Sequence, residues 1–212
     1  MNRLAAAALL ATSIMLSSLP ALADAFLDGV AAYDKGDYQA AHDLWQPLAD
    51  QGNPSAQRNL GHLYRRGLGV ERDAAQARDL YENAARQGLA GAQANLGRMY
   101  LRGDGIEQDY DKAFHWLTQA SRLGHVSARY RLATMHDYGL GRPANPEAAL
   151  LWYALAGKAG HKASLDRMVT LVALLPAPEL KPLAGRNLEK EQSPDAEIEQ
   201  PAGQSPISGK RR

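Results

Sequence analysis

The sequence predicts an all-α protein, a solenoid of about five stacked helix hairpins. A unit with a period of 36 residues recurs through the middle of the chain, and three sets of small residues follow it. Glycines stand at Gly52, Gly88, Gly124 and Gly160 and again at Gly67, Gly103 and Gly139, and alanines stand at Ala41, Ala77, Ala113 and Ala149. A fixed period of this length is typical of stacked copies of one supersecondary structure. Such stacks leave long grooves open, so we expect the protein to hold another molecule.

Residues 1–23 precede the repeats and predict an export signal. Arg3 is followed by an apolar run from Leu4 to Leu19, then by Pro20 and a small-residue pattern that ends at Ala23. This order is typical of a cleaved secretory signal peptide. The run is shorter than the roughly 20 apolar residues that a membrane span needs. We therefore expect cleavage near Ala23 and a periplasmic or secreted protein of a Gram-negative bacterium, with an uncleaved anchor as the alternative.

Composition narrows the expected partners. The chain contains no cysteine, which excludes disulfides and a thiol for lipid attachment. Removal of Arg3 with the signal leaves 24 − 1 = 23 basic residues against 23 acidic ones. A net charge near zero gives no indication of nucleic-acid binding. After signal cleavage we expect no stable membrane insertion.

Each repeat is expected to contain two amphipathic helices. In the second repeat one face of the first helix carries Ala56, Leu60, Gly61 and Tyr64, and one face of its partner carries Ala77, Leu80, Tyr81, Ala84 and Ala85. This spacing predicts an αα-hairpin whose helices bury these faces against each other.

Small residues inside the first helices predict close contact between helices. Gly61, Gly97 and Ala133 share one column, and Gly inside a helix costs about 1 kcal/mol relative to Ala. A recurring small residue there is therefore expected to admit a large side chain from the second helix. We assign that large side chain to the column of Leu44, Leu80, Trp116 and Trp152.

The turns between the paired helices also recur. Gly67, Gly103 and Gly139 each begin a Gly-x-Gly turn, and Asp73, Asp109 or Asn145 follows it. The first glycine suits a left-handed helix C-terminus, and Asp or Asn suits an N-cap. In the first repeat Gly36 and Asp37 are adjacent, so its turn is expected to be five residues shorter.

The C-terminal part predicts a capping element and a tail. Residues 162–175 resemble a fifth first helix, and residues 178–190 are expected to supply its partner. We therefore place the solenoid at 24–188. Residues 189–212 are rich in Glu, Gln, Ser, Pro and Gly and are expected to be disordered.

These residues together fit the frame A-x3-L-G-x2-Y-x2-G-x-G-V-x2-D-x3-A-x2-L/W-x3-A-x3-G, which three consecutive repeats match. His136 in the tyrosine column and Arg142 in the valine column depart from it. The frame resembles that of the SEL-one-like repeat family, a subclass of the tetratricopeptide-type α-solenoids. The resemblance implies a right-handed solenoid whose first helices line a concave surface, and a role in protein–protein interaction.

The sequence gives no indication of catalysis. The six histidines are scattered without metal-ligand spacing, and no serine lies in a G-x-S-x-G motif. The Gly-x-Gly turns lack the strand and the lysine of a phosphate-binding loop. We expect no catalytic residue, metal or cofactor. His125 and His161 share a column with Asn53 and Leu89, which we interpret as a tolerant surface position.

The first helices carry a basic face that the resemblance places on the concave surface. Its residues are Arg58, His62, Arg65, Arg66, Arg98, Leu101, Arg102, Tyr130, Arg131 and Tyr138. Arg forms bidentate pairs with carboxylates and stacks on aromatic rings, which suits acidic peptide segments or anionic envelope polymers. The alternative is a solvated face of exposed arginines that serves solubility alone.

Two functions are compatible with these observations. The first is a periplasmic adaptor, scaffold or regulator that binds the acidic segment of an envelope or peptidoglycan-associated protein. The second is a cell-wall-directed protein with weak β-lactam or peptidoglycan binding or hydrolysis, which is implied by secreted members of the family. Those relatives carry a disulfide in each repeat, and this chain has no cysteine. We therefore favour the adaptor.

Overall fold

The computed structural model describes residues 24–175, and every regular element in this range is an α-helix. Residues 24–34 are helical and precede α2 (Tyr38–Asp50), α3 (Pro54–Arg66), α4 (Ala74–Arg86), α5 (Ala90–Arg102), α6 (Tyr110–Arg122), α7 (Val126–Tyr138), α8 (Pro146–Lys158) and α9 (Lys162–Leu174). The predicted all-α class is confirmed. The predicted signal peptide, the partner helix at 178–190 and the tail lie outside the described residues. Between 24 and 175, no helix is long and apolar enough to cross a membrane.

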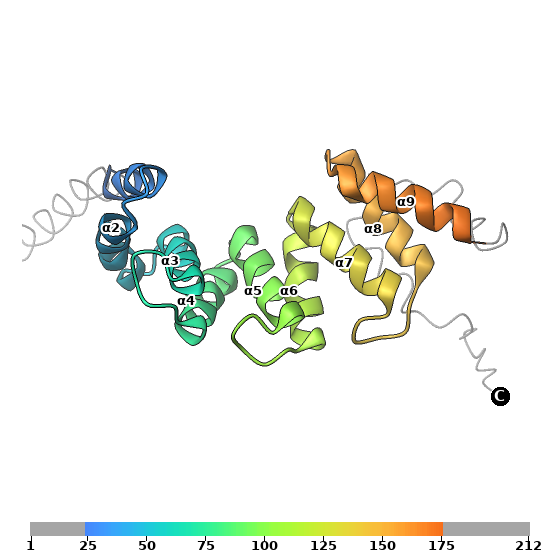
Figure 1. Cartoon of the computed structure of the whole chain (residues 1–212), viewed down its shortest axis with the longest axis horizontal. Helices are drawn as coiled ribbons and strands as arrows, with labels where there is room; N and C mark the ends of the chain where they lie inside the picture. The colour runs from blue at the N-terminus through green and yellow to red at the C-terminus, as the bar shows by residue number, and fades with distance from the viewer. Residues whose placement is uncertain (1–23, 176–212) are drawn as a thin grey trace, which may run out of the picture. The chain divides into compact units, whose positions relative to one another are not determined.

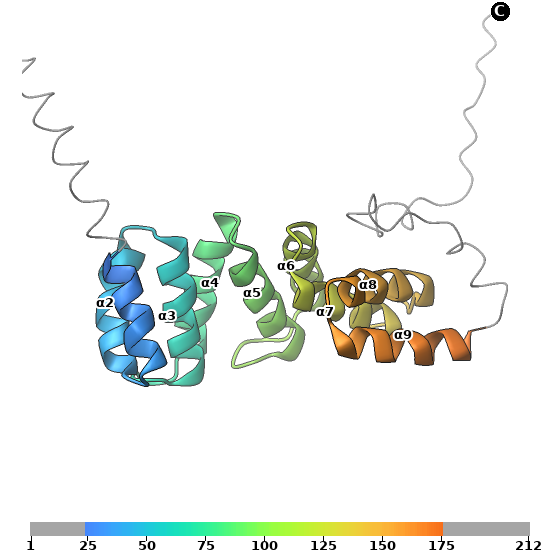
Figure 2. The ribbon, with the colours of Figure 1, turned by 90° about the horizontal axis from the view of Figure 1, so that it is seen from above.

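The chain divides into two compact units, with the boundary between Asp109 and Tyr110. In the first unit each helix packs on the next, from α2 to α5 (Figure 1). In the second unit α6 packs on α7, α7 on α8, and α8 on α9, and the last two helices lie side by side in Figure 2. Packing mainly between sequence neighbours is the arrangement expected of a repeat protein.

The close contact predicted at Gly61 is confirmed, but the large residue opposite it is different. A Cβ built on Gly61 would lie 3.0 Å from the ring of Tyr81. The residue opposite Gly61 is therefore Tyr81 and not the predicted Leu80. Tyr81 is fully buried because Ala77, Tyr81, Ala84 and Ala85 form the centre of the apolar stripe of α4. Leu80 lies at the edge of that stripe and is only partly buried.

The same correction holds along the repeats. The buried large residues are Trp45, Tyr81, Leu117 and Tyr153, one position after the predicted column. Of the predicted column only Trp152 is buried, whereas Leu44, Leu80 and Trp116 are half-buried. A helix turns about 100° per residue, so a shift of one position moves a side chain from the edge of a stripe to its centre. The assignment of Trp116 to the interhelix core was therefore wrong.

The predicted turns are confirmed. Gly67, Gly103 and Gly139 end α3, α5 and α7 with φ of 68°, 63° and 66°, a left-handed conformation that favours glycine. Asp73 and Asn145 accept hydrogen bonds from the backbone N–H groups three residues later and thus cap α4 and α8. In the first repeat Asp37 caps α2 directly after the turn, so that turn is the short one predicted.

The column of Asn53, His125 and His161 is an N-cap, which corrects its interpretation as a tolerant surface position. The side chain of Asn53 accepts from the backbone N–H groups of Ser55 and Ala56. His125 Nδ1 and His161 Nδ1 accept in the same way, at 3.3 and 3.2 Å. Leu89 in this column caps α5 without a side-chain hydrogen bond. The column therefore selects a side-chain acceptor in three repeats out of four.

The two departures from the repeat frame lie against the same ring. His136 is buried, and its ring meets that of Phe114 edge-on at 5.6 Å between centroids. The guanidinium of Arg142 lies 3.4 Å from the centroid of the Phe114 ring. Phe114 thus compensates for both substitutions, by an aromatic contact on one side and a cation–π contact on the other.

The predicted first helix of a fifth repeat is confirmed as α9. Val169 and Val172 of α9 share the columns of Gly61, which packs on the following helix α4, and of Tyr64, whose hydroxyl contacts His42 of α2. In α9 they are 67% and 41% exposed. Among the described residues this face of α9 is therefore uncovered.

Candidate partner-binding face

Seven of the ten predicted binding residues lie in the first unit, on α3 and α5, and three lie on α7 in the second unit. The first group contains Arg58, His62, Arg65, Arg66, Arg98, Leu101 and Arg102; the second contains Tyr130, Arg131 and Tyr138. We describe the two groups separately. The basic residues of α3 and α5 form the candidate site, because positive charge gathers there.

The charges of α3 and α5 are close enough to act on one another. Burial, and then Arg65, Arg66, Arg98 and Arg58 in that order, lower the pKa of His62 to about 4. His62 is therefore neutral at pH 7. Burial and the charges of Arg65 and Arg102 also lower the pKa of Arg98. These mutual effects show one cluster of cations that spans two successive first helices.

Arg65 belongs to this cluster but not to its exposed surface, an environment that the sequence did not predict. Its side chain is only 10% exposed, and its Nη1 donates to Asp104 Oδ2 at 2.9 Å. Arg72 donates to the other carboxylate oxygen at 3.0 Å and to the backbone oxygen of Arg65 at 3.2 Å. Asp104 lies in the turn after α5, so this ion-pair network links neighbouring repeats.

The remaining basic residues differ in exposure. Arg58, Arg66 and Arg102 are exposed, whereas Arg98 is half-buried. Leu101 is half-buried, and its backbone oxygen accepts from Gln108 at 2.8 Å. We define the basic face as Arg58, Arg66, Arg98 and Arg102.

A pocket of about 340 Å³ opens beside the basic face, in the same unit. It is lined by Val30, Tyr33, Trp45, Arg58, Asn59, His62 and Asn95. The hydroxyl of Tyr33 and Nε2 of His62 share a hydrogen bond of 3.1 Å, and the rings of Tyr33 and Trp45 lie 6.0 Å apart. One wall is thus aromatic and aliphatic, and the other is polar and basic. We call it the Tyr33 pocket.

The arginines at this pocket are held by asparagines. Arg58 donates from Nε and Nη2 to Asn59 Oδ1 at 3.2 and 2.9 Å, and Arg98 donates to Asn95 Oδ1 at 3.3 Å. A Cβ on Gly91, at the start of α5, would lie 3.1 Å from Arg58 Nη1. The small residue therefore leaves room for the guanidinium of Arg58 to reach across from α3.

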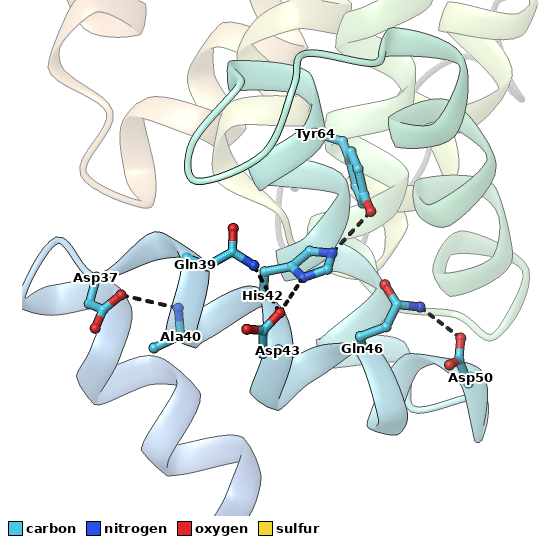
Figure 3. A network of polar contacts seen from close by, with 8 residues as sticks. All are labelled: Asp37, Gln39, Ala40, His42, Asp43, Gln46, Asp50 and Tyr64. Atoms are coloured by element: carbon cyan, nitrogen blue, oxygen red, sulfur yellow. Dashed lines mark hydrogen bonds and ion pairs between the residues drawn. The ribbon is translucent and has the colours of Figure 1, made fainter.

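A second polar network joins α2 to α3 (Figure 3). His42 Nε2 contacts the hydroxyl of Tyr64 at 3.0 Å, and His42 Nδ1 contacts Asp43 Oδ1 at 3.0 Å. The hydrogen bond from His42, and then that from Gln39, lower the pKa of Asp43, although burial acts in the opposite direction. Tyr64 packs against the core of the first unit. We therefore assign this network to packing between successive repeats.

The three residues of the second unit are mostly used in local packing. The ring of Tyr130 lies 4.5 Å from that of His161, and Arg131 donates to the backbone oxygen of Ser127 at 2.9 Å. Tyr138 is 60% exposed, with the guanidinium of Arg167 5.2 Å from its ring centroid. The residues from 24 to 175 hold no group of three or more His, Asp or Glu side chains arranged to bind a metal ion.

Comparison with known proteins identifies the repeat. The model of the Sel1 repeat matches four successive segments, 21–53, 54–89, 90–125 and 126–161, which together make up most of the chain. This chain belongs to the Sel1 repeat family. The predicted α-solenoid class is thereby confirmed, with four matched repeats followed by α9. Repeats of this family generally mediate protein interactions.

The chain is also similar to several solved structures. A Sel1 repeat protein from Oxalobacter formigenes is 34% identical, with a TM-score of 0.63 over 68% of this chain and 59% of that one. A protective antigen of uropathogenic Escherichia coli with an SLR fold is 22% identical, with a TM-score of 0.48 over 90% of this chain and 50% of that one. This chain thus spans 59% of the first protein and 50% of the second. A putative Sel1 repeat protein from Klebsiella pneumoniae is 20% identical, with a TM-score of 0.41 over 71% of this chain and 93% of that one. No curated protein matches the sequence significantly.

The apolar half of the Tyr33 pocket and its two asparagines were not among the predicted binding residues. Asn59 and Asn95 are 36 residues apart and so occupy one column of this Sel1 repeat protein, a signal that was present in the sequence. Tyr33 was not among the predicted binding residues. The shorter first turn and the small Gly29, whose added Cβ would clash with the ring of Trp45, are specific to this end of the chain.

The lowered pKa of His62 predicts a pH dependence of stability. Between about pH 6.5 and the folded pKa of about 4, His62 is protonated in the unfolded chain but neutral in the folded chain. The contribution of His62 to stability is therefore constant above pH 6.5 and falls as the pH drops toward 4. Because the side chain is only half-buried, we expect a loss of about 1 kcal/mol, well below the full value of such a shift.

Urea titrations of the wild type and of His62→Gln from pH 7 to pH 4.5 measure this effect. As the pH falls, the free energy of unfolding of the wild type should drop relative to that of His62→Gln. A difference that stays constant over this range would show that His62 titrates alike in the folded and unfolded chains.

Proposed function

We propose that this Sel1 repeat protein is an exported interaction module that binds an acidic segment of an envelope protein on its basic face. The signal-like residues 1–23 support export, and the periplasm of a Gram-negative bacterium is the proposed location. The family supports a role in protein interaction. The observation that carries the proposal is the gathering of cations on α3 and α5 in a chain whose total charge is near zero.

The local charge balance favours an anionic partner. Arg58, Arg66, Arg98 and Arg102 contribute four positive charges, and Asp104 is already shared by Arg65 and Arg72. Arg–carboxylate hydrogen bonds are about twice as strong as neutral ones, and Arg98 is partly desolvated before any partner arrives. An acidic segment would also relieve the repulsion that lowers the pKa of Arg98. Attraction between such surfaces should weaken as salt shortens its range to about 8 Å at physiological ionic strength.

Reversal of two exposed charges tests the proposal. Arg66 and Arg102 are 36 residues apart and end α3 and α5, so Arg66→Glu with Arg102→Glu changes equivalent positions of two repeats. We expect the amount of partner protein captured by crosslinking within cells to fall at least tenfold in this double variant. Its helical circular dichroism spectrum should be unchanged. Loss of charge-assisted hydrogen bonds of about 1.5–3 kcal/mol each accounts for an effect of this size.

The chain offers a matched control. Arg86 and Arg122 are also 36 residues apart and exposed, but they end the second helices α4 and α6. Arg86→Glu with Arg122→Glu therefore changes the net charge by the same amount away from the basic face. This control should capture the partner as the wild type does. Equal capture by both double variants, or equal loss, would show that the basic face does not select the partner.

A further inference from the structure

The Tyr33 pocket has a chemistry that the basic face alone does not explain. The basic face is an exposed surface, whereas the pocket is a hollow between the helix of residues 24–34, α2, α3 and α5. Its volume of about 340 Å³ lies at the lower end of the roughly 300–1,000 Å³ that is typical of ligand sites. The pocket is therefore of a size to hold one or two amino-acid side chains.

The polar wall of the pocket offers hydrogen-bond donors and few acceptors. The Oδ1 atoms of Asn59 and Asn95 already accept from Arg58 and Arg98. The polar atoms left to a ligand therefore include the asparagine amide N–H groups, the remaining N–H groups of Arg58 and the second ring nitrogen of His62. No carboxylate lines the pocket. A wall of donors with positive charge is complementary to a carboxylate.

The opposite wall is apolar and rigid. Val30 belongs to the helix of residues 24–34, and Tyr33, one turn later, packs on Trp45 at 6.0 Å between ring centroids. Trp45 is itself fixed by a hydrogen bond from its Nε1 to the backbone oxygen of Phe26 at 3.2 Å. Fixed aromatic walls of this kind take up aliphatic or aromatic groups with little loss of conformational freedom.

We infer that the Tyr33 pocket binds the C-terminal residue of a polypeptide, with its α-carboxylate on Arg58 and Asn95 and its apolar side chain against Val30 and Tyr33. In a terminal residue the carboxylate and the side chain leave the same carbon, so both fit one small pocket. An internal Asp or Glu carries its charge at the tip of a polar side chain and has no apolar group to offer the second wall. This inference rests on the proposed function and specifies that the acidic partner binds through its C-terminal end.

The chemistry leaves two sources of such a ligand, a polypeptide end and a free apolar acid. The neighbouring basic face favours the polypeptide. A chain whose last residue enters the pocket has its preceding residues close to the cations of α3 and α5. Acidic residues before the end of the chain would thus bind the basic face while the last residue fills the pocket. A free acid would use the pocket alone.

Fluorescence anisotropy with labelled peptides and the purified full chain tests the inference. The probe is an acidic peptide that ends in leucine with a free carboxylate, and the comparison is the same peptide with a C-terminal amide. We expect the amide peptide to bind at least about tenfold more weakly, because a charge-assisted hydrogen bond of about 1.5–3 kcal/mol is lost. Equal binding of the two peptides would overturn the inference.

Variants of the pocket localise the effect. Arg58→Gln should weaken the free-acid peptide about tenfold more than it weakens the amide peptide, so that the preference for the free acid disappears. Val30→Glu should weaken both peptides, since it places a charge in the apolar wall. The control is Arg86→Gln, which removes one exposed charge of the first unit outside the pocket and should change neither affinity. A preference for the free acid that persists in Arg58→Gln would contradict the assignment.

The outcomes separate this inference from the proposed function. If both peptides bind equally but lose affinity in Arg66→Glu with Arg102→Glu, the basic face binds acidic chains and the pocket inference is wrong. If N-acetyl-leucine alone competes as well as the whole peptide, the ligand is a free acid and the polypeptide assignment is wrong. Preference for the free-acid peptide, lost in Arg58→Gln, supports the inference even where partner capture in cells shows no dependence on Arg66 and Arg102.

Discussion

Tyr81→Ala is expected to lower the free energy of unfolding by about 3–5 kcal/mol, the range typical of large-to-alanine changes at buried aromatic residues. Tyr81 is fully buried on α4, and its ring lies against Gly61 of α3, so truncation opens a cavity at the centre of a repeat. The cavity has few means to collapse, because the backbone of α3 already lies at contact distance. A urea titration followed by circular dichroism measures the change.

Two substitutions provide controls for Tyr81→Ala. Tyr81→Phe keeps the ring and removes a buried hydroxyl that has no hydrogen bond of good geometry, so we expect a change within about 1 kcal/mol. Leu80→Ala, at the half-buried edge of the same helix, should cost clearly less than Tyr81→Ala. A loss below about 1 kcal/mol for Tyr81→Ala, or a larger loss for Leu80→Ala, would mean that the packing column is misassigned.

Asp137→Asn is expected to destabilise the second unit by about 2–4 kcal/mol, because it leaves a charge of a partly buried ion pair without its partner. The side chain of Asp137 is 4% exposed, and its two oxygens accept from Arg167 Nε at 2.6 Å and Arg167 Nη2 at 3.0 Å. Tyr153 of α8 also donates its hydroxyl to Asp137 at 3.1 Å. The network thus ties α7, α8 and α9 together, and amide hydrogen exchange should report increased opening of α9.

A double-mutant cycle separates the ion pair from general damage. Arg167→Met keeps a side chain of similar length and removes the charge, and it should be destabilising alone because Asp137 then remains buried with a single donor. The double variant should be less destabilised than the sum of the two single variants, by about 1 kcal/mol or more. Additive effects would show that the two side chains are energetically independent.

These variants also separate stability from binding. The basic face and the Tyr33 pocket are built entirely from residues of the first unit. Asp137→Asn should therefore leave the affinity for the free-acid peptide unchanged at a temperature where the protein remains folded. Tyr81→Ala should weaken that affinity, since Tyr81 packs under α3, which carries Arg58 and Arg66.

The elements that sequence reasoning located correctly are those encoded locally. The left-handed glycine at position 67 and the N-caps Asp73 and Asn145 depend on backbone conformation within a few residues. The glycine at position 61 was recognised as a point of close approach because glycine is unfavourable inside a helix unless space demands it. Such features repeat with the period and can be found by aligning the chain with itself.

The partner opposite Gly61 was misassigned by one residue, and the ion pair of Arg65 was not predicted. Leu80 and Tyr81 are both large and adjacent, so the pattern alone does not show which one faces α3. Arg65 was interpreted as a surface charge, but Asp104, 39 residues away, holds it in a mostly buried ion pair. The histidine N-caps at positions 125 and 161 were also missed, because histidine is seldom the residue that accepts at this position.

By itself, the sequence determined the all-α class, the boundaries of the repeats, their turns and the presence of cations on the first helices. These follow from periodicity and from backbone preferences that act over one or two helical turns. Only the tertiary structure decided which cations are exposed and that Tyr33, Asn59 and Asn95 line one pocket. The physical reason is that these contacts join side chains about 30 residues apart or more, whose meeting depends on rotamers and on how one helix is turned against the next.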